Sequence, residues 1–231
     1  MPDFSKRSYE KELLDGNHIP FKDIEQNMKE LEVINSWLGG HNITLQGFKR
    51  LLSTRRNITI CEIGCGGGDN MKVICKWAKK NNIEVKYIGV DINPDCIQYA
   101  KENCKGMEIK FIVSDYKYFM TDEKPDIIFS SLFCHHFNDE ELIYMLRWMK
   151  INSRIGFFIN DLERNPVAYY SIMSITSIFS NSYLVKNDAP LSVLRGFKKK
   201  EWESILELAG IINYTIKWKW AFRHLLVCYN D

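Results

Sequence analysis

The sequence lacks a long uninterrupted apolar segment. Its most hydrophobic stretch, residues 167–185, contains five serines, a threonine and an asparagine, so it is too polar to span a membrane. The N-terminus has no apolar segment typical of a secretory signal peptide. We therefore expect a cytoplasmic protein without a membrane span, for which peripheral contact with a membrane stays open.

The seven cysteines include no CxxC pair, the spacing that zinc sites and redox motifs commonly use. Their odd number and their positions in expected strands and helices indicate free thiols in a reducing compartment, and no metal site is predicted. A net charge of +2 and a hydrophobic content of 45% argue against disorder and against a nucleic-acid-binding surface. No internal repeat is present, and 231 residues suit a single domain.

Residues 61–69 form the most informative motif. They read Cys-Glu-Ile-Gly-Cys-Gly-Gly-Gly-Asp, directly after the β-branched run 58–60 and directly before a helical pattern. Glycine permits a sharp turn and lets a ligand touch bare backbone. The amides at the start of the following helix face such a ligand with the positive end of the helix dipole. The motif predicts a site for a nucleotide-like cofactor.

This loop lacks the dinucleotide fingerprint G-x-G-x-x-G, because Asp69 stands where the last glycine would be. An acidic side chain at a helix start is poorly placed for a pyrophosphate, but it suits a ligand with a cationic amine. S-adenosylmethionine carries an ammonium group and a sulfonium and has no phosphate. Glu62 and Asp69 therefore favour S-adenosylmethionine over a dinucleotide.

Two further expected strands end in carboxylates. Residues 85–91 end in Asp91, at about the distance along the chain at which such an acid meets ribose hydroxyls. Residues 109–114 are followed by Asp115. Three strands with acids at their ends, in this order, are consistent with one cofactor site.

Hydrophobic periodicity predicts alternating strands and helices after an N-terminal region, residues 8–53, that is largely helical. The last two strands are almost contiguous, so they must be antiparallel. The alternation indicates an α/β fold. The expected strands are 58–63, 85–91, 109–114, 126–132, 154–161, 212–220 and 222–229, and the expected helices are 69–80, 94–104, 139–150, 166–185 and 199–209.

The pattern Glu62-x-Gly64-x-Gly66-x-Gly68 resembles the first motif of class I SAM-dependent methyltransferases. Four longer stretches, 32–41, 131–137, 160–169 and 188–197, resemble the small-molecule branch of the methyltransferase type 11/UbiE-like group. The resemblance implies a Rossmann-like, seven-stranded, mostly parallel sheet with an antiparallel C-terminal strand and helices on both faces. It implies one domain, 1–231, with an N-terminal helical cap (1–53) over the cofactor mouth, a catalytic core (54–231) and a lid insertion at about 163–187.

The resemblance also implies the cofactor site. Asp115 would accept the adenine amino group, with Tyr116 beside the ring. S-adenosyl-L-methionine would be the methyl donor, and S-adenosyl-L-homocysteine the product. The predicted cofactor-binding residues are Glu62, Gly64, Cys65, Gly66, Asp69, Asp91, Ile92, Asp115, Tyr116 and Ser131.

Polar residues also follow the strands 126–132 and 154–161, where ligands of open α/β sheets bind. Histidine has an unperturbed pKa of about 6.5 and suits proton abstraction from a hydroxyl, and a nearby carboxylate can orient its ring. Our hypothesis is that His135, or with less support His136, is a general base and that Asp161 orients it. Because the link is expected to be extended, only one of the two histidines is expected to face the pocket.

An aromatic content of 13% favours a small apolar or aromatic acceptor. A histidine base favours O-methylation of a hydroxyl, and the resemblance implies secondary or quinone-like metabolism. C-methylation of a quinone or polyketide, methylation of RNA or protein, and non-catalytic binding of SAM stay as alternatives. A monomer and a homodimer both fit. Arg195 either meets an acidic group of the acceptor or forms a surface pair. The predicted acceptor-pocket residues are Trp37, Tyr169, Tyr170 and Arg195.

Overall fold

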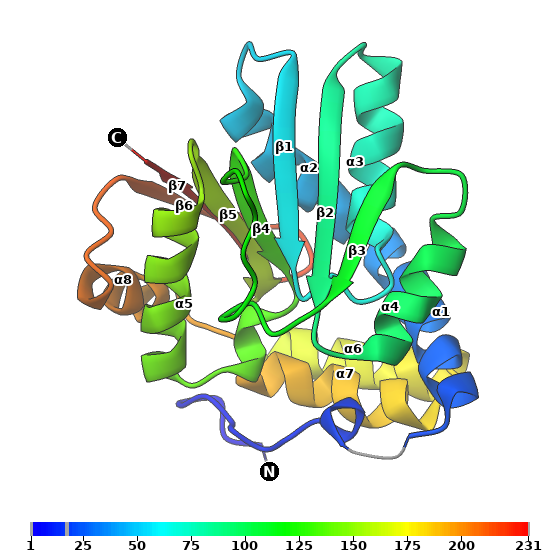
Figure 1. Cartoon of the computed structure of the whole chain (residues 1–231). Coiled ribbons are helices and arrows are strands. Elements are labelled where there is room, and N and C mark those ends of the chain that lie inside the picture. Colours follow the sequence, from blue (N-terminus) through cyan, green and yellow to red (C-terminus); the bar gives the residue numbers. More distant parts are fainter. Residues whose placement is uncertain (1, 17–18, 231) are drawn as a thin grey trace.

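The computed structural model describes residues 2–16 and 19–230 (Figure 1). In this part of the chain seven strands form one sheet, in the order β3-β2-β1-β4-β5-β7-β6. Strands β1 to β5 are mutually parallel, and β7 runs antiparallel to both β5 and β6, which confirms the predicted sheet. The strands are β1 (Asn57–Ile63), β2 (Glu84–Asp91), β3 (Ile109–Val113), β4 (Ile127–Ser131), β5 (Gly156–Leu162), β6 (Tyr214–Lys219) and β7 (Arg223–Tyr229).

Helices cover both faces of the sheet and cross its lower edge in Figure 1, where the strands β1 to β5 end. Helices α2 and α3 pack on one face, and α5 and α8 on the other. The helices are α1 (Phe21–Trp37), α2 (Gly40–Leu52), α3 (Asp69–Lys80), α4 (Pro94–Asn103), α5 (Asp139–Asn152), α6 (Pro166–Phe179), α7 (Tyr183–Arg195) and α8 (Lys199–Leu208), with short 3-10 turns η1 (Leu13–Asp15) and η2 (Cys134–His136).

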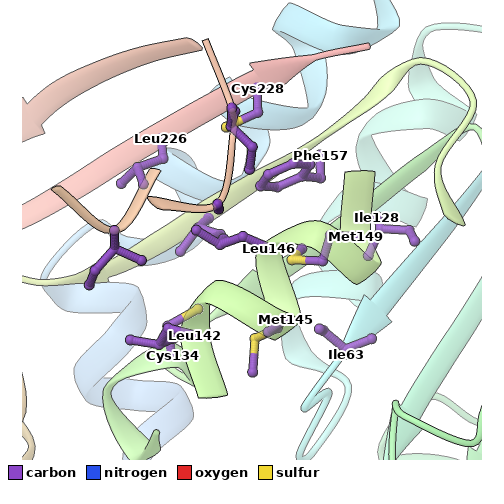
Figure 2. Packing of buried hydrophobic residues seen from close by; sticks show 14 of the residues in the cluster. Ile63, Ile128, Cys134, Leu142, Met145, Leu146, Met149, Phe157, Leu226 and Cys228 are labelled. Atoms are coloured by element: carbon purple, nitrogen blue, oxygen red, sulfur yellow. The ribbon is translucent and has the colours of Figure 1, made fainter. Parts of the chain in front are cut away.

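The central strands are buried on both faces because side chains alternate across the sheet. In β5, Phe157 faces the α5 side, whereas the next residue, Phe158, faces the α2 side and stacks on Phe129. Figure 2 shows the hydrophobic core on the α5 side of the sheet, in which four side chains of α5 pack against Ile63, Ile128 and Phe157. The four are Leu142, Met145, Leu146 and Met149. This packing fixes the strand ends from which the site is built.

The N-terminal region differs from the expectation of a largely helical segment. The described residues between 8 and 20 contain only the turn η1, and helix α1 begins after Pro20. The two helices that follow have different surroundings. Helix α1 borders the cavity described below through Met28 and Leu31. Helix α2 buries Phe48 and Leu51 in the core of the sheet instead.

The expected helix 166–185 is two helices, so that prediction was wrong. Helix α6 ends at Phe179, and Ser182 caps the start of α7 by accepting a hydrogen bond from the amide of Val185. Glu30 of α1 accepts hydrogen bonds from the hydroxyl of Ser180 and the amide of Asn181, which satisfies polar groups exposed by the break. Serine side chains such as those of Ser180 and Ser182 compete with helical hydrogen bonding. The apolar residues on both sides of them favoured the prediction of one continuous helix.

Among the described residues, no helix is both long and apolar enough to cross a membrane.

Candidate functional site

A cavity of about 1500 Å³ lies beyond the carboxyl ends of the parallel strands. The glycine loop between β1 and α3 forms one end of it, and η2 forms the other. Helix α1, the turn η1 and helices α6 and α7 contribute the remaining wall. All ten residues predicted to bind the cofactor border this cavity.

The glycine loop requires backbone conformations that other residues rarely adopt. Gly64 and Gly66 have φ values of +66° and +47°. A Cβ atom on Gly64 would lie 2.2 Å from the ring of Phe133, so a side chain cannot be placed there. The amide of Gly66 donates a hydrogen bond to Asp91 Oδ2 at 2.9 Å, which ties the loop to the end of β2. The loop is thereby held open toward the cavity.

Glu62 carries a buried carboxyl oxygen that meets no protein partner. Its side chain is 1% exposed, and Oε1 accepts a hydrogen bond from Asn70 Nδ2 at 2.8 Å. Within the described residues, Oε2 has no hydrogen-bond partner. Burial raises the pKa of this carboxyl well above its ordinary value. Because buried polar atoms are nearly always paired, an orphaned acceptor beside a cavity indicates a ligand with a donor group there.

Two further acids lie beside the loop. Asp91 accepts hydrogen bonds from the amides of Gly66 and Asn93, each at 2.9 Å, which leaves acceptor capacity on both of its oxygens. Asp69 accepts a hydrogen bond from Asn103 Nδ2 at 2.8 Å. Burial raises the pKa of Asp69 to about 7, with a further contribution from the charge of Glu32. This end of the cavity is therefore suited to a ligand that brings positive charge and hydroxyl groups.

Three of the remaining predicted cofactor residues, Ile92, Asp115 and Tyr116, fall into two groups. Ile92, which is 67% exposed, and Asp115 both border the cavity, so both can meet a ligand. Tyr116 borders the cavity too, but its ring packs edge-on against Phe137 and Trp148. It therefore belongs largely to the core and offers less ring surface to an adenine than the sequence analysis predicted.

The end formed by η2 brings two histidines together. His135 is 3% exposed, and its Nδ1 lies 2.8 Å from Asp161 Oδ1, as predicted. The ring of His136 lies beside it, with centroids 4.5 Å apart, and both rings border the cavity. The expectation that only one histidine faces the pocket was wrong, because the link is a 3-10 turn and does not place successive side chains on opposite sides.

Asp161 fixes this turn. It is fully buried, and its Oδ2 accepts hydrogen bonds from the amides of Phe133 (3.2 Å) and Cys134 (2.7 Å), while Oδ1 accepts one from Leu162 (2.8 Å). Burial opposes its ionisation, but His135 and these amides prevail and lower its pKa. Asp161 is thus held as a charged carboxylate next to the imidazole of His135.

Two acids that the sequence analysis missed complete the cluster. Glu12 Oε1 lies 3.4 Å from Nε2 of His135, and its Oε2 lies 3.7 Å from Nε2 of His136. Asp15 Oδ1 lies 3.3 Å from Nδ1 of His136. These acids are more than 100 residues away in sequence, so no local spacing could have revealed them.

Glu12 changes the interpretation of His135. Burial disfavours the imidazolium, but Asp161 and Glu12 outweigh burial and raise the pKa of His135 to about 9. In this arrangement His135 holds a proton at neutral pH. It could act as a general base only after Glu12 leaves Nε2.

The predicted acceptor-pocket residues are mostly elsewhere. Trp37 is 71% exposed outside the cavity, because it lies on the outer side of α1. Tyr169 and Tyr170 pack against Phe4, also outside the cavity. Arg195 borders the cavity, but its guanidinium donates to the carbonyl oxygens of His135 and Glu10. The apolar wall is formed instead by other residues, including Ile34, Leu38, Ile172, Ile175, Val193 and Phe222.

Residues 54–210 match the family model of a methyltransferase domain. This match spans more than half of the chain, so the protein belongs to that methyltransferase family. No curated protein matches the sequence.

Solved structures share the fold at low identity. The plantazolicin methyltransferase BpumL, in complex with SAH, is 18% identical, with a TM-score of 0.63 over 90% of this chain and 99% of BpumL. A SAM-dependent methyltransferase from Aquifex aeolicus is 16% identical, with a TM-score of 0.65 over 90% of this chain and 98% of that one. Human N-acetylserotonin methyltransferase, in complex with SAM, is 16% identical, with a TM-score of 0.63 over 92% of this chain and 57% of the human enzyme. The fold is thus the Rossmann-like fold of class I methyltransferases.

Proposed function

We propose that this protein transfers the methyl group of S-adenosyl-L-methionine to a hydroxyl of a small apolar or aromatic acceptor. One observation carries the proposal: a single cavity joins a glycine loop flanked by acids to a cluster of histidines and carboxylates. S-adenosylmethionine supplies an electrophilic methyl group on a sulfonium. The family match and the names of the structural neighbours support methyl transfer as the reaction class.

The donor's charges match the acids at the glycine loop. Glu62 Oε2 is a buried acceptor that lacks a partner among the described residues, and an ammonium group would satisfy it together with Asp69. Asp91 retains acceptor capacity for ribose hydroxyls, and Asp115 can accept from an adenine amino group. Ile92 offers an exposed apolar surface to the adenine ring.

The acceptor would lie between the apolar wall and the η2 cluster. Ile172 and Ile175 of α6 face the cavity there, and His135 and Glu12 supply polar groups for a hydroxyl. The proposed lid role of segment 163–187 rests on α6 and α7 forming this wall. Two further proposals are carried over from the sequence: membership of the UbiE-like branch, and a cytoplasmic location, which the seven free cysteines support.

Donor binding is expected to strengthen as pH rises through about 7. Below its pKa of about 7 the carboxyl of Asp69 is protonated, and only the ionised form attracts an ammonium group. Titrations with S-adenosylhomocysteine one unit below and half a unit above that pH should therefore differ by about five- to tenfold in affinity, with the tighter binding at the higher pH. The variant Asp69→Asn should remove most of this difference. A difference of equal size in the variant would contradict the role of Asp69.

The proposed reaction is tested by a screen with methyl-labelled S-adenosylmethionine. Phenols and quinols are offered as acceptors, with aniline-type amines as the matched amino-nitrogen series. Label in a phenol or quinol product, located on oxygen by mass spectrometry, is the expected result. Label on ring carbon would replace O-methylation by C-methylation, and label only on amines would refute a hydroxyl acceptor.

A further inference from the structure

The cluster at η2 has an arrangement that the proposed function does not require. His135 and His136 each direct Nε2 toward the same carboxylate, Glu12. We propose that Glu12, His135 and His136 form a binding site for a divalent transition-metal cation such as Zn²⁺. The three ligand atoms lie within 4.8 Å of one another, on the wall of the cavity. The inference goes beyond the proposed function, since it concerns a cation and holds whatever the acceptor is.

The distances within the cluster separate two kinds of contact. The bond from His135 Nδ1 to Asp161 is 2.8 Å, as expected for a charge-assisted hydrogen bond. The contacts of Glu12 with the two Nε2 atoms are longer, at 3.4 and 3.7 Å. Ligand atoms that each lie about 2.0–2.1 Å from one tetrahedral ion are about 3.3 Å apart. The two contacts are made by different oxygens of Glu12, Oε1 with His135 and Oε2 with His136, and both separations lie near this spacing of ligand atoms around one ion.

The outer contacts of both histidines also match a metal site. A histidine that binds a metal nearly always donates its other ring N–H to a carboxylate, a carbonyl or a water, which fixes the tautomer. Here Nδ1 of His135 contacts Asp161, and Nδ1 of His136 lies 3.3 Å from Asp15. Both rings thus direct Nε2 toward Glu12, and a cation that binds there would displace the proton that His135 holds. Binding of a hydroxyl acceptor does not require two histidines that both direct Nδ1 toward a carboxylate and Nε2 toward Glu12.

The position of Glu12 is built into the fold. Its Oε1 accepts a hydrogen bond from the hydroxyl of Ser192 at 2.7 Å, and Asp188 accepts from the amides of Leu13 and Leu14 at 2.8 and 3.0 Å. Helix α7 therefore holds the N-terminal segment against η2. The charge is also suitable: Glu12, Asp15 and Asp161 supply three carboxylates, and Arg195 Nη1, 3.6 Å from Asp15, offsets part of their charge.

The ligand set indicates the class of cation. Two imidazoles and one carboxylate suit Zn²⁺, Fe²⁺ or Mn²⁺, whereas Mg²⁺ prefers oxygen ligands alone. Three protein ligands leave at least one coordination position open, as in catalytic rather than structural zinc sites. The cluster borders the cavity, so an acceptor oxygen could take that position and have its pKa lowered by the cation. His135 would then be a ligand and no longer a candidate base.

The test uses the full chain after treatment with a chelator and dialysis, without donor or acceptor. Calorimetric titration with Zn²⁺ should show saturable binding of one ion per chain, and Co²⁺ should give visible absorption without a thiolate charge-transfer band. His136→Gln and Glu12→Gln should abolish this binding. Asp15→Asn, which leaves all three ligands in place, should weaken it by about 10–100-fold.

His41→Gln is the matched control, because His41 lies outside the cavity and should leave Zn²⁺ binding unchanged. Binding of S-adenosylhomocysteine by each variant verifies that it is folded, since the glycine loop is at the other end of the cavity. No Zn²⁺ binding by the wild type, binding unaffected by both ligand substitutions, or a thiolate band with Co²⁺ would each overturn the proposal. None of these outcomes depends on whether an acceptor has been found, so failure of the proposed reaction remains separate.

Discussion

Replacing Glu62 with Gln is expected to weaken binding of S-adenosylhomocysteine by about 10–100-fold. Hydrogen bonds to charged groups contribute about 1.5–3 kcal/mol, and each 1.4 kcal/mol is tenfold in affinity. Glutamine retains the shape of Glu62 and can still accept the hydrogen bond from Asn70 at Oε1. What it loses is the carboxyl oxygen Oε2, which has no partner among the described residues, because the amide NH2 that replaces it cannot accept a hydrogen bond from the proposed ammonium group. Calorimetric titration of the two proteins measures the difference.

Glu84→Gln provides the control for this substitution. Glu84 is an exposed residue at the start of β2, at the opposite end of the strands from the cavity. Its replacement changes the net charge by the same amount and should leave the affinity unchanged. Equal affinities for wild type and Glu62→Gln would show that the ammonium group binds elsewhere.

Replacing Asp161 with Ala is expected to lower the free energy of unfolding by about 3–5 kcal/mol. Each buried donor left without a partner costs about 1–3 kcal/mol of stability. Removing one partner of a buried ion pair costs about 3–5 kcal/mol. The substitution removes the acceptor of the amides of Phe133, Cys134 and Leu162 and of His135 Nδ1. Urea unfolding followed by tryptophan fluorescence measures the change.

Asp126→Ala is the matched substitution at the other end of the sheet. Asp126 accepts a hydrogen bond from the amide of Thr59 and pairs with Arg154, whose side chain is 57% exposed. Fewer and less buried partners predict a smaller loss of about 1–2 kcal/mol. If the two substitutions cost the same, Asp161 does not hold the η2 turn as described.

The parts of the fold that the sequence predicts are those with local causes. β-branched runs, Asn93-Pro94 at the start of α4 and the glycine loop act within a few residues, and all five parallel strands lie within two residues of their expected bounds. The antiparallel end of the sheet follows from the short link before β7. The ten cofactor residues border one cavity because parallel strands bring their carboxyl ends to one edge of the sheet.

The parts that the sequence does not predict depend on contacts between distant segments. Glu12 joins the cluster because α7 holds the N-terminal segment by Asp188 and Ser192. Helix α7 itself contains Pro190, which normally argues against a helix interior. Trp37 is predicted to line the pocket, but the sequence does not tell which side of α1 faces the cavity, and the side chain is exposed. Such features require the tertiary structure.

The most direct test of the proposed function is calorimetric titration of the purified protein with S-adenosylhomocysteine, with NAD in a parallel cell. The acids at the glycine loop and Asp69 in place of the dinucleotide glycine predict micromolar binding of S-adenosylhomocysteine and no binding of NAD. Binding of NAD alone would contradict the assignment of the cavity to a methyl donor.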